Sequence, residues 1–162
     1  KTSWRKADRR LQADAFPAKH THGERILRVF TNVNPDGKPS RWKIGEPFGD
    51  MATKFIHTIP RYSKTQAKVM HLLGITKTIR GEYDHTMLHL HDLVKADADY
   101  QLNAPQMTFE FPANSSWVVY SDQVLHAVLS GQYMMEQTLH LPQEKLRYPE
   151  ASPQQLIAKM VK

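Results

Sequence analysis

The sequence predicts a mainly β protein, a sandwich or barrel, with helices inserted into it. Strand-like runs lie in both ends of the 162-residue chain, whereas helix-like runs gather between residues 50 and 98. This order differs from the strand–helix alternation of a parallel sheet and favours packed antiparallel strands. We therefore expect one domain over residues 1–162, with a helical insertion at about 50–98.

The first strand-like run, at residues 11–16, alternates in character. Successive side chains of a strand point to opposite faces, so Gln12 and Asp14 would share one face and the small or apolar residues around them the other. Residues 25–33 are the strongest strand signal in the chain. Turn-forming residues follow them, and a run at 41–45 is expected to return as the hairpin partner.

Three helices are expected over residues 50–58, 64–73 and 78–98. In the third, apolar side chains recur at spacings of three and four, which would bury one face of that helix. Those side chains are Ile79, Tyr83, Met87, Leu90 and Val94. Strand signals then resume, and a Ser-Pro pair opens a closing helix. These later elements are expected at 106–111, 116–120, 126–130, 132–141 and 152–161.

The composition narrows the classes of function. The chain has no cysteine, which excludes disulfides and thiolate metal sites, and it has no apolar run of bilayer-spanning length. Its net charge of +6 favours an anionic partner, such as nucleic acid, a phospholipid surface or an acidic metabolite. Basic residues, Lys1, Arg5 and Lys6 among them, gather near the N-terminus, but no nucleic-acid motif accompanies them. We therefore expect no nucleic-acid partner.

A metal site is the chemistry that the strand pattern suggests. Gln12 and Asp14 would share one strand face, and His126 opens a downstream strand. If these strands share one barrel, a carboxylate and an imidazole meet inside it, as in the facial arrangement of non-haem Fe(II) oxygenases. The spacing is also compatible with a structural role, in which Asp14 caps a turn and His126 is hydrogen-bonded within a core.

Other histidines offer competing sites. His85, His89 and Asp92 would share one face of the third helix, but position 86 is Thr where a metalloprotease helix has Glu. This face lies opposite the apolar stripe, so we expect it to meet solvent. His20 and His22 follow Asp14 in a loop and are candidate extra ligands or lid residues, or members of an ordinary polar loop.

An anion site is suggested by the strand at 25–33. Arg28 and Asn32 fall on the same face of that strand. An arginine on a barrel wall can bind a carboxylate through two parallel hydrogen bonds, with Asn32 as a helper donor. The alternative is an arginine on the wet side of the strand.

Five segments carry a family resemblance: WRKADRRLQADAFP at residues 4–17, GERILRVFTNVNP at 23–35, GEYDH at 81–85, SDQVLHAVLSGQY at 121–133 and EQTLHLP at 136–142. Together they resemble the Kdo 3-hydroxylases, bacterial Fe(II)- and 2-oxoglutarate-dependent dioxygenases. The resemblance covers nearly the whole chain, which would form the C-terminal two-thirds or so of a full-length member. The chain is therefore expected to be a fragment of a longer protein.

The resemblance implies a double-stranded β-helix, a jelly-roll or cupin-like fold, with an H-x-D…H iron triad. By position, Asp14 is the carboxylate ligand, His126 the distal imidazole, and Gln12 occupies the place of the first histidine. Three outcomes are open: a weakened site, a replacement ligand such as His20 or His22, or lost catalysis. The family's usual arginine about ten residues after the distal histidine is missing, so Arg28, helped by Asn32, becomes the candidate 2-oxoglutarate anchor.

The resemblance also implies an activity: hydroxylation of the Kdo sugar of Kdo-lipid A at carbon 3, giving Ko, with Fe(II) as cofactor and 2-oxoglutarate and dioxygen as cosubstrates. Such an enzyme would work in the cytoplasm, with a peripheral contact at the inner membrane. The alternative is a non-catalytic cupin-like module that binds an acidic sugar or lipid. Gln12, in the place of the first histidine, would then be the sign of lost catalysis.

Overall fold

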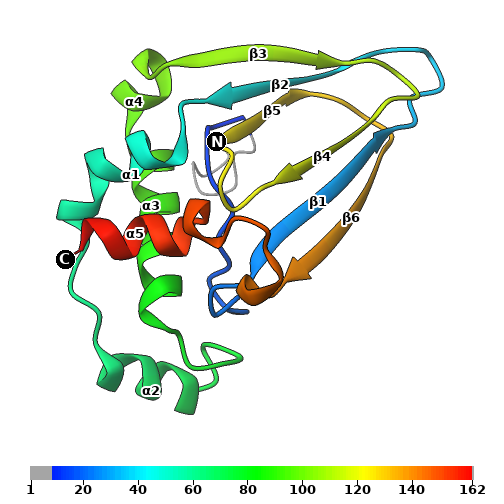
Figure 1. Cartoon of the computed structure of the whole chain (residues 1–162). Helices are drawn as coiled ribbons and strands as arrows, with labels where there is room; N and C mark the ends of the chain where they lie inside the picture. Colours follow the sequence, from blue (N-terminus) through cyan, green and yellow to red (C-terminus); the bar gives the residue numbers. More distant parts are fainter. Residues whose placement is uncertain (1–8, 162) are drawn as a thin grey trace.

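Two three-stranded antiparallel sheets face each other, and a layer of helices covers one end of them (Figure 1). The computed structural model describes residues 9–161, so the basic residues Lys1, Arg5 and Lys6 lie outside the described part. The elements in chain order are β1 (Arg25–Asn32), β2 (Ser40–Gly45), α1 (Phe48–Phe55), η2 (Ile56–Thr58), α2 (Lys64–Leu72), α3 (Glu82–Ala96), α4 (Ala98–Asn103), β3 (Gln106–Phe111), β4 (Ser116–Tyr120), β5 (His126–Ser130), β6 (Met134–Leu141), η3 (Gln143–Lys145), η4 (Pro149–Ala151) and α5 (Pro153–Met160).

The expected fold class, mainly β with inserted and flanking helices, is confirmed. One sheet has the strand order β4-β1-β6 and the other β3-β2-β5, all pairs being antiparallel. The inner faces of the sheets meet through aromatic side chains. Phe30 of β1 packs edge-on against Trp42 of β2, with ring centroids 4.9 Å apart, and Trp117 of β4 also reaches Trp42 at 5.5 Å. These rings fill the space between the sheets at one end.

The expected hairpin between residues 25–33 and 41–45 is wrong, because β1 and β2 belong to different sheets. The connection between them is longer than the two-residue turn that pairs neighbouring strands, so the chain can cross from one sheet to the other. The Asn32 amide secures this crossing by donating to the carbonyls of Lys38 (3.0 Å) and Phe111 (3.1 Å). Those two carbonyls flank the far sheet, so Asn32 joins the two sheets.

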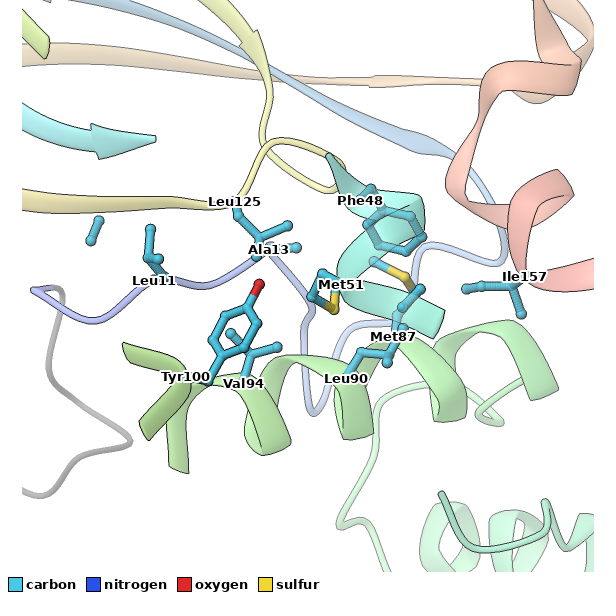
Figure 2. Close-up of a cluster of buried hydrophobic side chains, with 12 residues drawn as sticks. Leu11, Ala13, Phe48, Met51, Met87, Leu90, Val94, Tyr100, Leu125 and Ile157 are labelled. Atoms are coloured by element: carbon cyan, nitrogen blue, oxygen red, sulfur yellow. The ribbon is translucent and has the colours of Figure 1, made fainter. Parts of the chain in front are cut away.

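The run at residues 11–16 forms a single β-bridge, Gln12 with His126, and is otherwise irregular. The expected strand is therefore wrong in extent, but its alternation is confirmed. Leu11 and Ala13 are buried in a hydrophobic core that joins the sheets to the helices, and Gln12 and Asp14 point the other way. Figure 2 shows this core, whose largest members include Phe48, Met51, Met87, Leu90, Val94, Tyr100, Leu125 and Ile157.

The helices start and end differently from the expected ranges. The third helix begins at Glu82, so Ile79 precedes it and is 44% exposed instead of belonging to the buried stripe. It ends at Ala96, because the side chain of Asp97 accepts a hydrogen bond from the Tyr100 backbone N–H and so caps a separate helix, α4. Among residues 9–161, none of the helices has the length and apolar character required to cross a bilayer.

Candidate metal centre

Two short segments from opposite ends of the chain meet at Gln12 and His126. The backbone N–H of each residue donates to the carbonyl of the other, at 3.0 and 2.9 Å. On either side of each residue the neighbours point into the core shown in Figure 2, and the residue itself points into the space between the sheets. The four neighbours are Leu11, Ala13, Leu125 and Ala127. Hydrophobic packing on one side therefore fixes the direction of the polar side chains on the other.

Asp14 and His126 are brought together as the sequence predicts. The Asp14 Oδ1 and His126 Nε2 atoms are 3.8 Å apart, and both side chains are nearly buried. The Asp14 backbone N–H donates to the Ser121 carbonyl at 2.7 Å, which fixes the carboxylate from behind. His126 Nδ1 lies 2.8 Å from the Val124 carbonyl, so Nδ1 carries the proton and the lone pair of Nε2 faces Asp14. Metal-bound histidines are commonly oriented in this way.

Buried oxygens without hydrogen-bond partners complete this half-site. Gln12 Oε1 is buried and accepts no hydrogen bond, and Asp14 Oδ2 is buried with only the Arg28 guanidinium beside it. Buried acceptors of this kind are costly unless a cation or a donor satisfies them. Asp14 Oδ1, His126 Nε2 and the Gln12 amide oxygen give two oxygens and one nitrogen, ligand types that bind divalent cations. The amide oxygen of Gln12 is a poorer ligand for Fe(II) than an imidazole nitrogen.

Arg28 lies beside the carboxylate. Its Nη2 is 2.9 Å from Asp14 Oδ2, a close ion-pair contact without the geometry of a hydrogen bond, and its Nη1 donates to Glu136 Oε1 at 2.8 Å. Arg28 Nε is buried and has no partner. Both Nη atoms of the guanidinium are paired with carboxylates, while residue Arg28 forms part of the cavity wall. This placement agrees with Arg28 as the candidate carboxylate anchor, which stays a prediction.

A cavity of about 880 Å³ opens in front of these groups. Its volume is ample for a small dicarboxylate and part of a sugar. Its wall is made by Arg9, Gln12, Asp14, Arg28, Phe30, Trp42, His126, Val128, Leu129, Ser130, Gly131, Met134 and Glu136. Asn32 is not in this wall, because its amide is used by backbone groups at the crossing between the sheets. The structure therefore does not support Asn32 as a helper donor.

The loop histidines do not reach the cavity. His20 Nδ1 is paired with Thr78 Oγ1 at 2.9 Å, and His20 Nε2 accepts from Arg80 Nε at 3.3 Å. Burial lowers the pKa of His20, which favours the neutral ring. His22 turns toward Asp84, with Nδ1 3.6 Å from Oδ2. Neither residue is placed to replace Gln12 as a ligand.

The helical histidines are also used within the fold. The expectation that their face meets solvent is wrong for His85, which is 9% exposed and whose Nε2 lies 2.8 Å from the Pro60 carbonyl. The His85 and His89 rings pack together with centroids 4.4 Å apart, and burial lowers the pKa of His89. Within residues 9–161 no group of three or more His, Asp, Glu or Cys side chains is arranged to hold a metal ion. The candidate centre is not such a group, because only Asp14 and His126 are of these residue types and the third donor is the Gln12 amide.

Three supporting contacts were missed by sequence reasoning. His91 Nδ1 lies 2.7 Å from the Ala13 carbonyl, so this histidine holds the backbone between Gln12 and Asp14. Arg25 pairs with Asp122 at 2.6 Å in the interior and so fixes the turn that precedes His126. The third is Glu136 against Arg28. Glu136 lies ten residues after His126, where the family's arginine was expected, and this position was the signal in the sequence that could have identified it.

The fold and the centre define a class: a β-sandwich that holds a carboxylate and an imidazole against a polar cavity, as non-haem metal oxygenases do. The chain belongs to the family of 3-deoxy-D-manno-oct-2-ulosonic acid (Kdo) hydroxylases, whose model matches residues 1–162. No curated protein sequence gives a significant match.

Solved structures of the Kdo hydroxylase KdoO, described as a non-haem Fe(II) α-ketoglutarate-dependent dioxygenase, are similar to this chain. The complex with α-ketoglutarate and Fe(III) is 50% identical with a TM-score of 0.96, and 99% of this chain covers 55% of that one. The complex with succinate and Fe(III) is 49% identical over the same shares, with a TM-score of 0.95. The complex with cobalt(II) is 50% identical with a TM-score of 0.96, and 99% of this chain covers 54% of it. The chain thus spans about half the length of these relatives.

Proposed function

We propose that this chain carries the metal centre of an Fe(II)- and 2-oxoglutarate-dependent dioxygenase that hydroxylates the Kdo sugar of Kdo-lipid A at carbon 3, giving Ko. The observation that carries the proposal is the pair formed by Asp14 and His126. Their 3.8 Å approach leaves a carboxylate oxygen and an imidazole lone pair facing the cavity. The family membership and the ligands named for KdoO support the choice of iron and 2-oxoglutarate.

Each residue has a distinct part in this proposal. Asp14, His126 and Gln12 would hold the metal, which, when bound with 2-oxoglutarate, supplies the activation of dioxygen. Arg28, which lines the cavity, would bind the distal carboxylate of 2-oxoglutarate. Phe30 and Trp42 line the cavity and would exclude water from the reacting groups.

Gln12 weakens this centre without abolishing it. An amide oxygen is neutral and a weaker donor to Fe(II) than imidazole, so the affinity for iron should fall. His20 and His22 are engaged elsewhere, which leaves a weakened centre of Asp14, His126 and Gln12 as the outcome that the geometry favours. We expect turnover at saturating iron and little at trace iron.

The substrate and location follow from the same activity. Kdo-lipid A is a membrane-anchored glycolipid that bears carboxylates and phosphates, and the chain carries a net charge of +6. We place the protein in the cytoplasm, with a peripheral contact at the inner membrane, where this substrate would meet a basic surface.

Cobalt(II) titration and succinate release test the proposal. The parent chain, Gln12→His and Asp14→Ala would each be titrated with Co(II), and then assayed for succinate formed from 2-oxoglutarate with Kdo-lipid A and saturating Fe(II). We expect Gln12→His to bind Co(II) on the order of ten- to a hundredfold more tightly than the parent, and Asp14→Ala not to bind. The parent and Gln12→His should both release succinate.

Two results would argue otherwise. If neither the parent nor Gln12→His bound metal, the placement of the ligands would be wrong. If Gln12→His released succinate and the parent released none at saturating iron, the natural chain would be a non-catalytic module that binds an acidic sugar or lipid. Gln12 is the specific observation that favours this second function.

A further inference from the structure

The positive charge of the chain is concentrated in one segment. Residues 51–81 contain six Lys and Arg and no Asp or Glu, so they account for the whole net charge of +6. The rest of the chain is balanced. The segment runs from the second half of α1 through η2 and α2 to the loop before α3, and α2 lies at the end of the helical layer away from both sheets (Figure 1). Arg61, Lys64, Lys68 and Lys77 are exposed.

Large apolar side chains are exposed in the same segment. Leu72 is 85% exposed, Leu73 68% and Ile75 57%, and Val69 is also largely in contact with solvent. Single exposed apolar residues are ordinary, but four within seven consecutive residues form a contiguous patch. We call Val69, Leu72, Leu73 and Ile75, together with Lys64 and Lys68, the α2 tip.

The basic and apolar residues of the α2 tip lie on one side of the helix. Lys64, Lys68 and Leu72 are spaced by four and so form one stripe, with Val69 and Leu73 beside it. The opposite side holds Ala67, which is buried against the body. The outward side therefore presents lysines and leucines together, while the inward side fixes the helix.

The base of the α2 tip is held by the fold. The Tyr62 hydroxyl donates to the Arg80 carbonyl at 2.7 Å, which joins the two loops that flank α2. The Ser63 side chain caps the helix by accepting from the Gln66 N–H. Lys64 stands in the first turn, which has no acidic residue, although a positive charge there opposes the helix dipole. An external anion would offset that cost.

We propose that the α2 tip docks on a membrane surface rich in anionic lipid. Lysines next to exposed leucines fit the boundary between lipid headgroups and acyl chains, where the leucines enter the apolar layer and the lysines meet headgroup phosphates. A second copy of the chain is the poorer occupant, because a symmetric contact would bring two surfaces of the same charge together. The link to a glycolipid substrate rests on the proposed function, but the docking itself does not.

Vesicle co-sedimentation without metal or 2-oxoglutarate tests this surface. The parent should bind phosphatidylglycerol vesicles at least tenfold more tightly than phosphatidylcholine vesicles. Leu72→Asn/Leu73→Asn and Lys64→Glu/Lys68→Glu should each weaken binding to phosphatidylglycerol at least tenfold. The matched control is Leu102→Asn, because Leu102 is 77% exposed on α4 outside the α2 tip, and its binding should equal that of the parent. Circular dichroism would verify that every variant is folded.

The outcomes separate the occupants. No binding of the parent to anionic vesicles, or an equal loss in Leu102→Asn, would overturn the proposal. If Leu72→Asn/Leu73→Asn turned a dimer into a monomer and left vesicle binding unchanged, the α2 tip would be an interface between copies. If that variant bound vesicles like the parent and stayed monomeric, the tip would be a surface that a further segment of a longer family member covers. Loss of dioxygenase activity would change none of these readings, since the assay needs no turnover.

Discussion

The histidine of the cavity and the histidines of the helical layer differ in which ring nitrogen is already used. His126 gives only Nδ1 to the protein, at the Val124 carbonyl, and leaves the Nε2 lone pair facing a carboxylate. In the helical layer, His85 has its Nε2 at the Pro60 carbonyl. In the loop after Asp14, His20 uses both of its nitrogens. Spacing in the sequence made the helical pair a competing metal motif, and the structure uses it for packing. What sets His126 apart is that its remaining nitrogen lies 3.8 Å from a carboxylate oxygen in the cavity.

Removing one acid or one histidine separates these two regions most sharply. Asp14→Ala should abolish measurable Co(II) binding, because it removes the proposed carboxylate ligand, whereas His85→Ala should leave the affinity unchanged. Isothermal titration with Co(II) measures both. The reverse pattern, with binding lost only in His85→Ala, would place the metal on α3.

The core behind the cavity should matter almost as much. Leu125 is fully buried next to His126, so Leu125→Ala should lower the free energy of unfolding by about 2–5 kcal/mol and weaken Co(II) binding as well. Urea denaturation gives the first quantity. The exposed Leu102→Ala is the control and should stay within about 0.5 kcal/mol of the parent. A loss at Leu125 no larger than in the control would contradict the role of this core in fixing the ligand.

His91 tests a histidine that serves the site from the helical side. His91→Ala removes the donor to the Ala13 carbonyl and should reduce Co(II) affinity about tenfold, with a smaller effect on stability. His91→Asn retains an N–H donor and should recover part of the affinity. A purely structural role predicts a lower melting temperature with the same Co(II) affinity.

The pH dependence of stability should be the smallest effect. Burial lowers the pKa values of His20, His89 and His91, so the folded protein favours their neutral rings. Their contribution is complete above the ordinary histidine pKa of about 6.5 and is lost as the pH falls below it toward the folded values. The melting temperature, measured without metal, should therefore fall by a few degrees from pH 7.5 to 5.5. An unchanged or higher value at pH 5.5 would show that these rings are not held neutral.

Local sequence patterns predicted some side-chain directions in the site, but they did not predict the partner strands of β1 or the burial of His85. The alternation around Gln12 and Asp14 placed their side chains correctly, because a residue-by-residue change of face needs no knowledge of the partner strand. Local alternation could not predict which strands pair with β1. The crossing of the chain from one sheet to the other depends on hydrogen bonds between segments, such as those that the Asn32 amide donates. The burial of His85 was hidden because the loop at Pro60, which covers it, has no periodic pattern.

Some parts of the centre lay beyond any single segment. The pairing of Arg28 with Glu136 joins β1 to β6, and the hydrogen bond from His91 joins α3 to the segment at Ala13. Each contact links residues that the sequence separates widely. The family resemblance assigned Asp14 and His126 their expected roles, and those roles are still predictions.

The bridge between Gln12 and His126 has a consequence for biosynthesis. Within this chain Asp14 is synthesised before any of the helices and strands, and His126 follows only after α1–α4 and β1–β4. Contacts between such distant segments close late, because the intervening chain must first lose its conformational freedom. A nascent chain therefore presents Asp14 long before His126 can lie beside it. A metal bound by both residues, as proposed, would bind late in folding and link two segments that are far apart in the sequence.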